Sequence, residues 1–112
     1  MQLSEIQHIA EVAEKACAAV ANHPRNKDLR DELFDLLGPV ARLARVDDST
    51  YSAHLHDIIR QTGVWADILR HRLETSRSGI VASPLVSITQ PARDLQNLLH
   101  QLVGELQLPP DV

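Results

Sequence analysis

The stretch "SPLVSITQPARDLQNLLHQLVGEL", residues 83–106, carries the clearest structural pattern in the chain. Its aliphatic residues recur at alternating steps of three and four positions, which places them on one face of a helix. They are Leu85, Ile88, Ala92, Leu95, Leu99, Leu102 and Leu106. Ser83 followed by Pro84 is typical of a helix start, because serine caps free backbone N–H groups and proline suits the first helical position. The stretch therefore predicts an amphipathic helix over 84–107.

Three earlier segments repeat this spacing, and we expect helices over 4–22, 27–46 and 50–75. Asn26 is the expected N-cap of the second helix, and Asp48 or Ser49 that of the third. Two prolines fall inside the second and fourth helices, where each removes a backbone hydrogen bond. The apolar pattern keeps its phase across both, so we predict kinks near Pro39 and Pro91 rather than breaks.

Four amphipathic helices joined by short connections predict an all-α, antiparallel up-down-up-down four-helix bundle. We expect one helical-bundle domain over 1–112, because a chain of this length suits a single core. The expected core positions of the first helix are Leu3, Ile6, Ala10, Ala13, Cys17 and Val20. Those of the second helix are Leu29, Leu33, Leu36, Val40 and Leu43. Those of the third helix are Tyr51, Leu55, Ile58, Thr62, Trp65 and Leu69. The same spacing in the third helix also places Arg72 on the core face, where its head group would reach out to water.

Composition narrows the classes of function. The 11 basic and 15 acidic residues give a net charge of −4, and the pI is about 5.8, which argues against nucleic acid as a partner. The lone Cys17 leaves no disulfide within the chain and no cysteine-based metal site. With no signal-peptide pattern at the N-terminus, we expect a cytoplasmic protein. No apolar run approaches the roughly 20 residues of a membrane span, so we expect no membrane partner.

The residues that could carry chemistry do not form a catalytic or metal-binding pattern. His54 and His56 point about 200° apart on a helix and cannot hold one ion together. Glu5 and His8 have the spacing of one half of a di-iron site, but both fall on the outward face. We therefore predict no catalytic residues, no metal ligands and no cofactor, and an enzyme using His54 with Asp57 is a third and weaker hypothesis.

The first helix is apolar on more than one side. Ile9, Val12, Ala16 and Ala19 form a second stripe beside the core stripe. A four-helix bundle buries about three residues in seven of each helix, so this surplus indicates a second interface. A wide core face is the alternative explanation. Pairing of two first helices about a two-fold axis would give a homodimer, which is the simplest closed arrangement.

A basic patch lies near the end of the third helix and comprises Arg70, His71, Arg72 and Arg77. Cations at a helix C-terminus interact favourably with the helix dipole, which is one explanation for the patch. The other is contact with an acidic partner or a phosphate.

These patterns favour a non-enzymatic helical protein-interaction module, acting as an adaptor, regulator or accessory subunit and self-associating through apolar helix faces. The alternative is a small-ligand or metal-binding four-helix bundle. In that case kinks at Pro39, Gly63 and Pro91 would open a pocket between the helices, and Trp65 would line it.

Overall fold

The computed structural model of the protein describes residues 3–46, 52–78 and 84–107, and within them every regular element is a helix. The predicted all-α class is therefore confirmed. The described elements are α1 (Leu3–Asn22), α2 (Lys27–Ala41), the 3₁₀ helix η1 (Arg42–Arg45), α3 (Ala53–Ser78) and α4 (Pro84–Gln107).

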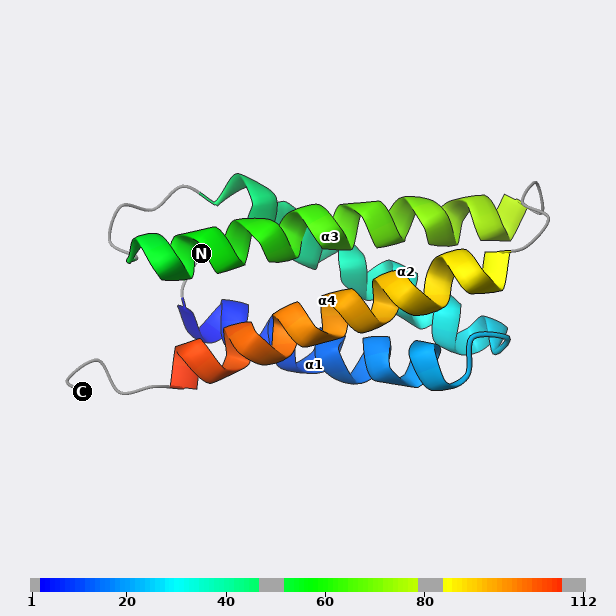
Figure 1. The fold of residues 1–112 in the computed structure, drawn as a ribbon, viewed down its shortest axis with the longest axis horizontal. Coiled ribbons are helices and arrows are strands. Elements are labelled where there is room, and N and C mark those ends of the chain that lie inside the picture. Colours follow the sequence, from blue (N-terminus) through cyan, green and yellow to red (C-terminus); the bar gives the residue numbers. More distant parts are fainter. Residues whose placement is uncertain (1–2, 47–51, 79–83, 108–112) are drawn as a thin grey trace.

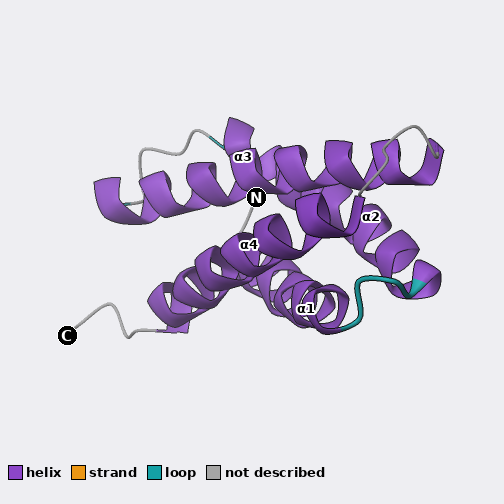
Figure 2. Cartoon of the chain, turned by 45° about the vertical axis from the view of Figure 1, so that its right-hand side comes forward, coloured by secondary structure: helices purple, strands orange, loops and turns teal. Residues whose placement is uncertain are grey.

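Each long helix packs against two others. α1 contacts α2 and α4, and α3 contacts the same two helices from the other side. The chain reverses direction along the long axis of the molecule from each long helix to the next (Figure 1). In the view turned by 45°, α1 and α4 still lie side by side, with α3 above them (Figure 2). The outer faces of the helices are therefore the surfaces on which a partner could dock.

Side-chain caps set two of the helix starts. Asn26 Oδ1 accepts a hydrogen bond from the backbone N–H of Leu29 at 3.2 Å, which confirms the expected N-cap of α2. In α3 the cap is Ser52, whose Oγ accepts from the N–H of Leu55 at 3.2 Å. This helix therefore begins at Ala53 rather than at residue 50. The expected caps Asp48 and Ser49 lie outside the described residues.

The second helix differs from the prediction at its end. It is α-helical only to Ala41, and the next four residues form η1, whereas one helix was expected over 27–46. Pro39 lacks a backbone N–H and so removes one α-helical hydrogen bond, and a tighter 3₁₀ turn is a common way to finish a helix. The α-helical conformation continues through Pro39 in α2 and through Pro91 in α4.

The core follows the predicted stripes closely in α1 and α4. Ten expected positions are at most 1% exposed: Ile6, Ala10, Ala13, Cys17 and Val20 in α1, and Ile88, Ala92, Leu95, Leu99 and Leu102 in α4. Leu106 is half-buried and packs against the core. The side chains of Leu3, Tyr51 and Leu85 lie outside the described set.

In α2 and α3 the expected stripe is partly wrong. Leu33, Val40, Leu43, Ile58, Thr62 and Leu69 are buried as expected. At three positions, however, the buried residue is one later than predicted: Leu37 instead of Leu36 in α2, and Ala66 instead of Trp65 and Leu73 instead of Arg72 in α3. A strict 3.5-residue repeat drifts by about 20° per heptad against the 3.6 residues per turn of a straight helix. Over a helix of 26 residues this drift moves the buried face to the neighbouring residue.

η1 lies directly on the backbone of α3 at Gly63. A Cβ atom at Gly63 would lie 2.7 Å from Ala44 Cα and 2.8 Å from the carbonyl carbon of Leu43, closer than real Cβ atoms approach other atoms. His56 Nε2 donates a hydrogen bond to the Val46 carbonyl oxygen at 2.9 Å and so ties the end of η1 to the same helix. Gly63 therefore permits a close approach of two backbones, and α3 continues through it without interruption.

Candidate functional site

The predicted interface stripe of α1 lies beside α2. Its four residues, Ile9, Val12, Ala16 and Ala19, are all half-buried. Ile9 and Ala16 pack against the core, whereas Val12 and Ala19 are not among the residues that do so. Three of the four line a surface hollow of about 270 Å³, which we call the α1–α2 hollow; its residues are Val12, Lys15, Ala16, Ala19, Leu29 and Glu32.

The α1–α2 hollow combines an apolar centre with two charges of opposite sign. Val12, Ala16, Ala19 and Leu29 supply the apolar part. Lys15 from α1 and Glu32 from α2 are both exposed. Apolar centres with polar edges are typical of protein–protein interfaces. Sequence reasoning missed Lys15 and Glu32, although the position of Lys15 next to the stripe on α1 is a usable signal.

Three residues of the predicted basic patch, Arg70, His71 and Arg72, follow one another on α3. Successive residues of a helix turn by about 100°, so Arg70, His71 and Arg72 point in different directions. His71 Nε2 lies 3.6 Å from Asp67 Oδ2, one turn earlier on α3. Arg72 is exposed, and the side chain of Arg77 lies outside the described set.

Arg70 instead joins two arginines that sequence reasoning missed. With Arg42 and Arg45 of η1, it lines a hollow of about 400 Å³ between α2, η1 and α3. We call it the arginine groove, and its main residues are Arg42, Arg45, Val64, Asp67, Ile68 and Arg70. The guanidinium carbon of Arg70 lies 4.8 Å from the centre of the Phe34 ring, a cation–π arrangement that holds the arginine in place. Arg42 and Arg45 are three residues apart, a spacing that puts side chains on the same side of a helix.

Two histidines connect α4 to its neighbours through carboxylates. His54 of α3 lies with Nε2 3.3 Å from Glu105 Oε1, and His100 Nδ1 donates to Glu14 Oε1 of α1 at 2.8 Å. Asp57 accepts a hydrogen bond from Gln61 rather than from His54. The pairing of His54 with Asp57 on which the weaker enzyme hypothesis depends is therefore not formed. Exposed ion pairs of this kind contribute at most about 1 kcal/mol to stability.

No group of three or more His, Cys, Asp or Glu side chains in the described part of the chain is arranged to hold a metal ion. Glu5 and His8 are both exposed on α1, on the outward face where the sequence places them. In the same described residues, no helix is long and apolar enough to cross a lipid bilayer.

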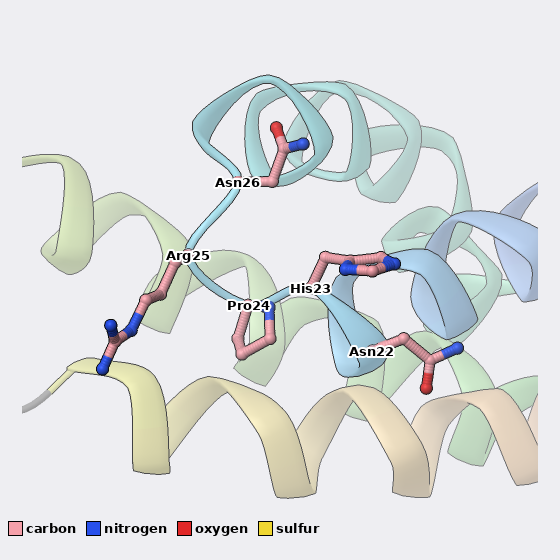
Figure 3. A pocket seen from close by; sticks show the side chains of 5 residues that line it. All are labelled: Asn22, His23, Pro24, Arg25 and Asn26. Carbon is pink, nitrogen blue, oxygen red and sulfur yellow. The ribbon is translucent and has the colours of Figure 1, made fainter.

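A third hollow, of about 520 Å³, surrounds the connection between α1 and α2. Figure 3 shows that its side chains diverge: Arg25 points away from the ring of His23. The side-chain oxygen of Asn26 already caps α2. Because its polar groups do not converge on one point, this hollow is a weaker candidate than the other two.

Cys17 lies in the core as a neutral thiol. It is fully buried, and burial, together with the nearby charge of Glu14, raises the pKa of its thiol to about 12. Because the thiolate is the nucleophilic form, this cysteine is chemically inert in the folded protein.

Cys17 should therefore resist thiol reagents until the protein unfolds. We expect negligible reaction with Ellman's reagent at pH 8 in buffer and complete reaction of the one thiol in denaturant. The unfolded thiol ionises from about pH 9, whereas the folded one stays neutral towards pH 12. The difference in unfolding free energy between wild type and Cys17→Ala should thus be constant below pH 8. Above pH 9 it should fall by up to about 1.4 kcal/mol per pH unit. Rapid labelling of the native protein would contradict the burial of this thiol.

The chain matches no protein-family model, no curated protein and no solved structure.

Two described surfaces combine apolar residues with charged ones. The α1–α2 hollow has one charge of each sign, and the arginine groove has mainly positive charge. The α1–α2 hollow is built by the first two helices. The arginine groove is built by α2, η1 and α3.

Proposed function

We propose that this protein is a non-enzymatic helical protein-interaction module that self-associates through the apolar face of α1. It would serve as an adaptor, regulator or accessory subunit, and its working form would be a homodimer. The observation that carries the proposal is the α1–α2 hollow, a surface hollow that Val12, Ala16 and Ala19 line together with Leu29. The small alanine side chains allow a second helix to approach closely.

The charges of the α1–α2 hollow suit a second copy of the same chain. In a two-fold interface, a contact from residue i to residue j is repeated from j to i. Lys15 of one chain can then face Glu32 of its partner, and the reverse pair forms on the other side of the axis. Both residues are exposed in the single chain and therefore accessible to a partner.

We propose that the helices form an antiparallel up-down-up-down bundle with kinks near Pro39 and Pro91. The reversals between successive helices (Figure 1) and the position of both prolines inside helices support this description. A bundle keeps the outer face of α1 rigid, which lowers the entropy cost of binding. We place the protein in the cytoplasm, where an unpaired thiol such as Cys17 stays reduced.

Charge reversal tests the two-fold interface directly. Lys15→Glu leaves two acidic residues in the hollow of each chain, and Glu32→Lys leaves two basic ones. Each variant alone should dimerise about tenfold more weakly than wild type, because two attractive contacts become repulsive. An equimolar mixture should form a heterodimer of near wild-type affinity, because both cross-chain pairs are then complementary. Light scattering coupled to size exclusion measures the masses against the 12.5 kDa of one chain.

Two results would contradict the proposal. One is a wild-type protein with the mass of a single chain at all accessible concentrations. The other is a mixture of Lys15→Glu and Glu32→Lys that associates no better than either variant alone. As a control, Arg93→Glu reverses an exposed charge of α4 outside the hollow and should leave the dimer unchanged.

A further inference from the structure

The arginine groove concentrates positive charge on a protein that is acidic overall. Arg42 and Arg45 come from η1 and Arg70 from α3, and Asp67 is the only acidic residue among the described residues that line the groove. Asp67 already lies beside His71. Arg42 and Arg45 are exposed, and neither forms an ion pair with an acidic residue in the described ranges. The groove therefore offers three cations to an anionic ligand.

Arg70 also carries a hydrogen-bond donor that lacks an acceptor. Its Nε atom is buried and has no hydrogen-bond partner among the described residues, while its guanidinium group is held over Phe34. Buried donors are almost always satisfied in native proteins, so an unsatisfied one calls for an explanation. A carboxylate is a strong acceptor for an arginine, because both its oxygens can bond to the planar guanidinium group.

The groove also has an apolar part. Val64 is 50% exposed, the one large hydrophobic side chain that stands out so far in the described structure. Ile68 lies one turn further along α3 and lines the same groove, together with the small residues Ala41 and Ala44. Residues four apart lie on one helix face, so Val64 and Ile68 form a continuous apolar strip next to the arginines.

The walls of the groove are held together before any ligand binds. η1 is seated on α3 at Gly63, where Ala44 approaches the backbone closely, and the hydrogen bond from His56 to Val46 secures its end. Preorganised sites lose less entropy on binding. The volume of about 400 Å³ falls within the roughly 300–1,000 Å³ of typical ligand sites.

From these observations we infer that the arginine groove binds an acidic segment of a partner protein, in which an aliphatic side chain lies between carboxylates. The aliphatic side chain covers Val64 and Ile68, and the carboxylates pair with Arg42, Arg45 and Arg70. Nucleic acid fits less well, because a net charge of −4 repels a long polyanion. Bases also stack on exposed aromatic rings, whereas Arg70 covers Phe34 here. The groove is separate from the α1–α2 hollow, so this site does not depend on the homodimer.

A synthetic peptide with central leucines flanked by glutamates on both sides is a suitable probe. Titrated into the ¹⁵N-labelled full chain, it should shift the backbone amide signals of Ala44, Val64 and Ile68 and leave those of α1 unmoved. The double variant Arg42→Glu and Arg45→Glu should bind it at least about tenfold more weakly. The control Arg60→Glu reverses an exposed arginine of α3 outside the groove and should change the affinity by less than about twofold.

A second peptide tests the apolar contact. Replacing the leucines with glutamines keeps the charge and should weaken binding by about tenfold or more. The inference is overturned if this peptide binds as tightly as the first, if the double variant binds like wild type, or if millimolar peptide shifts no groove signal. It is also overturned if single-stranded RNA of equal charge shifts the same signals with equal affinity, since the groove would then recognise phosphate. Val12→Glu, which disrupts only the proposed dimer, should bind the peptide as wild type does.

Discussion

Replacing Gly63 with alanine should lower the free energy of unfolding by about 3 kcal/mol, although alanine is the better helix former. The added methyl group would lie within 3 Å of the Leu43 and Ala44 backbone, so η1 must move away from α3. Overpacking costs about 1–3 kcal/mol. Partial exposure of the fully buried Leu43 adds a part of the roughly 1.5–3 kcal/mol that complete burial of a leucine contributes. The gain in helix propensity returns only about 1 kcal/mol. Urea denaturation followed by circular dichroism measures the net change.

Gly104→Ala is the matched control, because Gly104 also lies inside a helix and a Cβ there would meet nothing within 4 Å. This variant should be more stable than wild type by roughly 0.5–1 kcal/mol, the usual benefit of removing glycine from a helix. Opposite signs for the two substitutions would separate the packing effect from helix propensity. A Gly63→Ala variant at least as stable as wild type would show that η1 does not lie against α3 as described.

The same substitution should also disturb the arginine groove. Ala44 lies against Gly63, and both Ala44 and Val64, the residue after Gly63, line the groove. Moving η1 would therefore carry Arg42 and Arg45 away from Arg70. In the peptide titration, Gly63→Ala should weaken binding even at temperatures where the variant remains folded, whereas Gly104→Ala should not.

Local signals explain why the helices could be predicted from sequence. Asn26 caps α2 through a hydrogen bond to a residue three positions later, and Pro84 begins α4. Such interactions involve neighbouring residues only, so their pattern is visible in the chain. The set of buried residues in α3 is predicted less well. A heptad repeat assumes a fixed buried face, whereas the buried face of this long helix drifts along its length.

Contacts between helices explain most of what the sequence did not reveal. From its neighbours, Gly63 looked like a destabilising residue or a kink, and only the approach of η1 shows why glycine is needed there. His54 has a carboxylate three residues away in Asp57, yet its partner is Glu105 on another helix. Arg70 and Arg42 also come from different helices, and only the fold brings them to one groove. The second apolar stripe of α1, in contrast, can be recognised in the sequence because its four residues belong to one helix.

Val12→Glu should convert the proposed homodimer into a folded monomer. Val12 is half-buried at the α1–α2 hollow and is not among the residues that pack against the core. In a single chain the new carboxylate can therefore reach water, and glutamate is compatible with the middle of a helix. In the dimer it would be buried against apolar side chains, which we expect to cost about 3 kcal/mol and to weaken dimerisation at least about 100-fold.

Two quantities should be measured for each variant, its molar mass and its helicity. Val12→Glu is expected to elute with the 12.5 kDa of one chain and to keep the wild-type circular dichroism spectrum. Val64→Glu places the same charge on an exposed valine of α3 outside the hollow and should remain a dimer. A Val12→Glu variant that stays dimeric would exclude the α1 face as the interface. If both valine variants become monomeric, the interface extends to α3, and the arginine groove would then be covered by the second chain rather than open to an acidic partner.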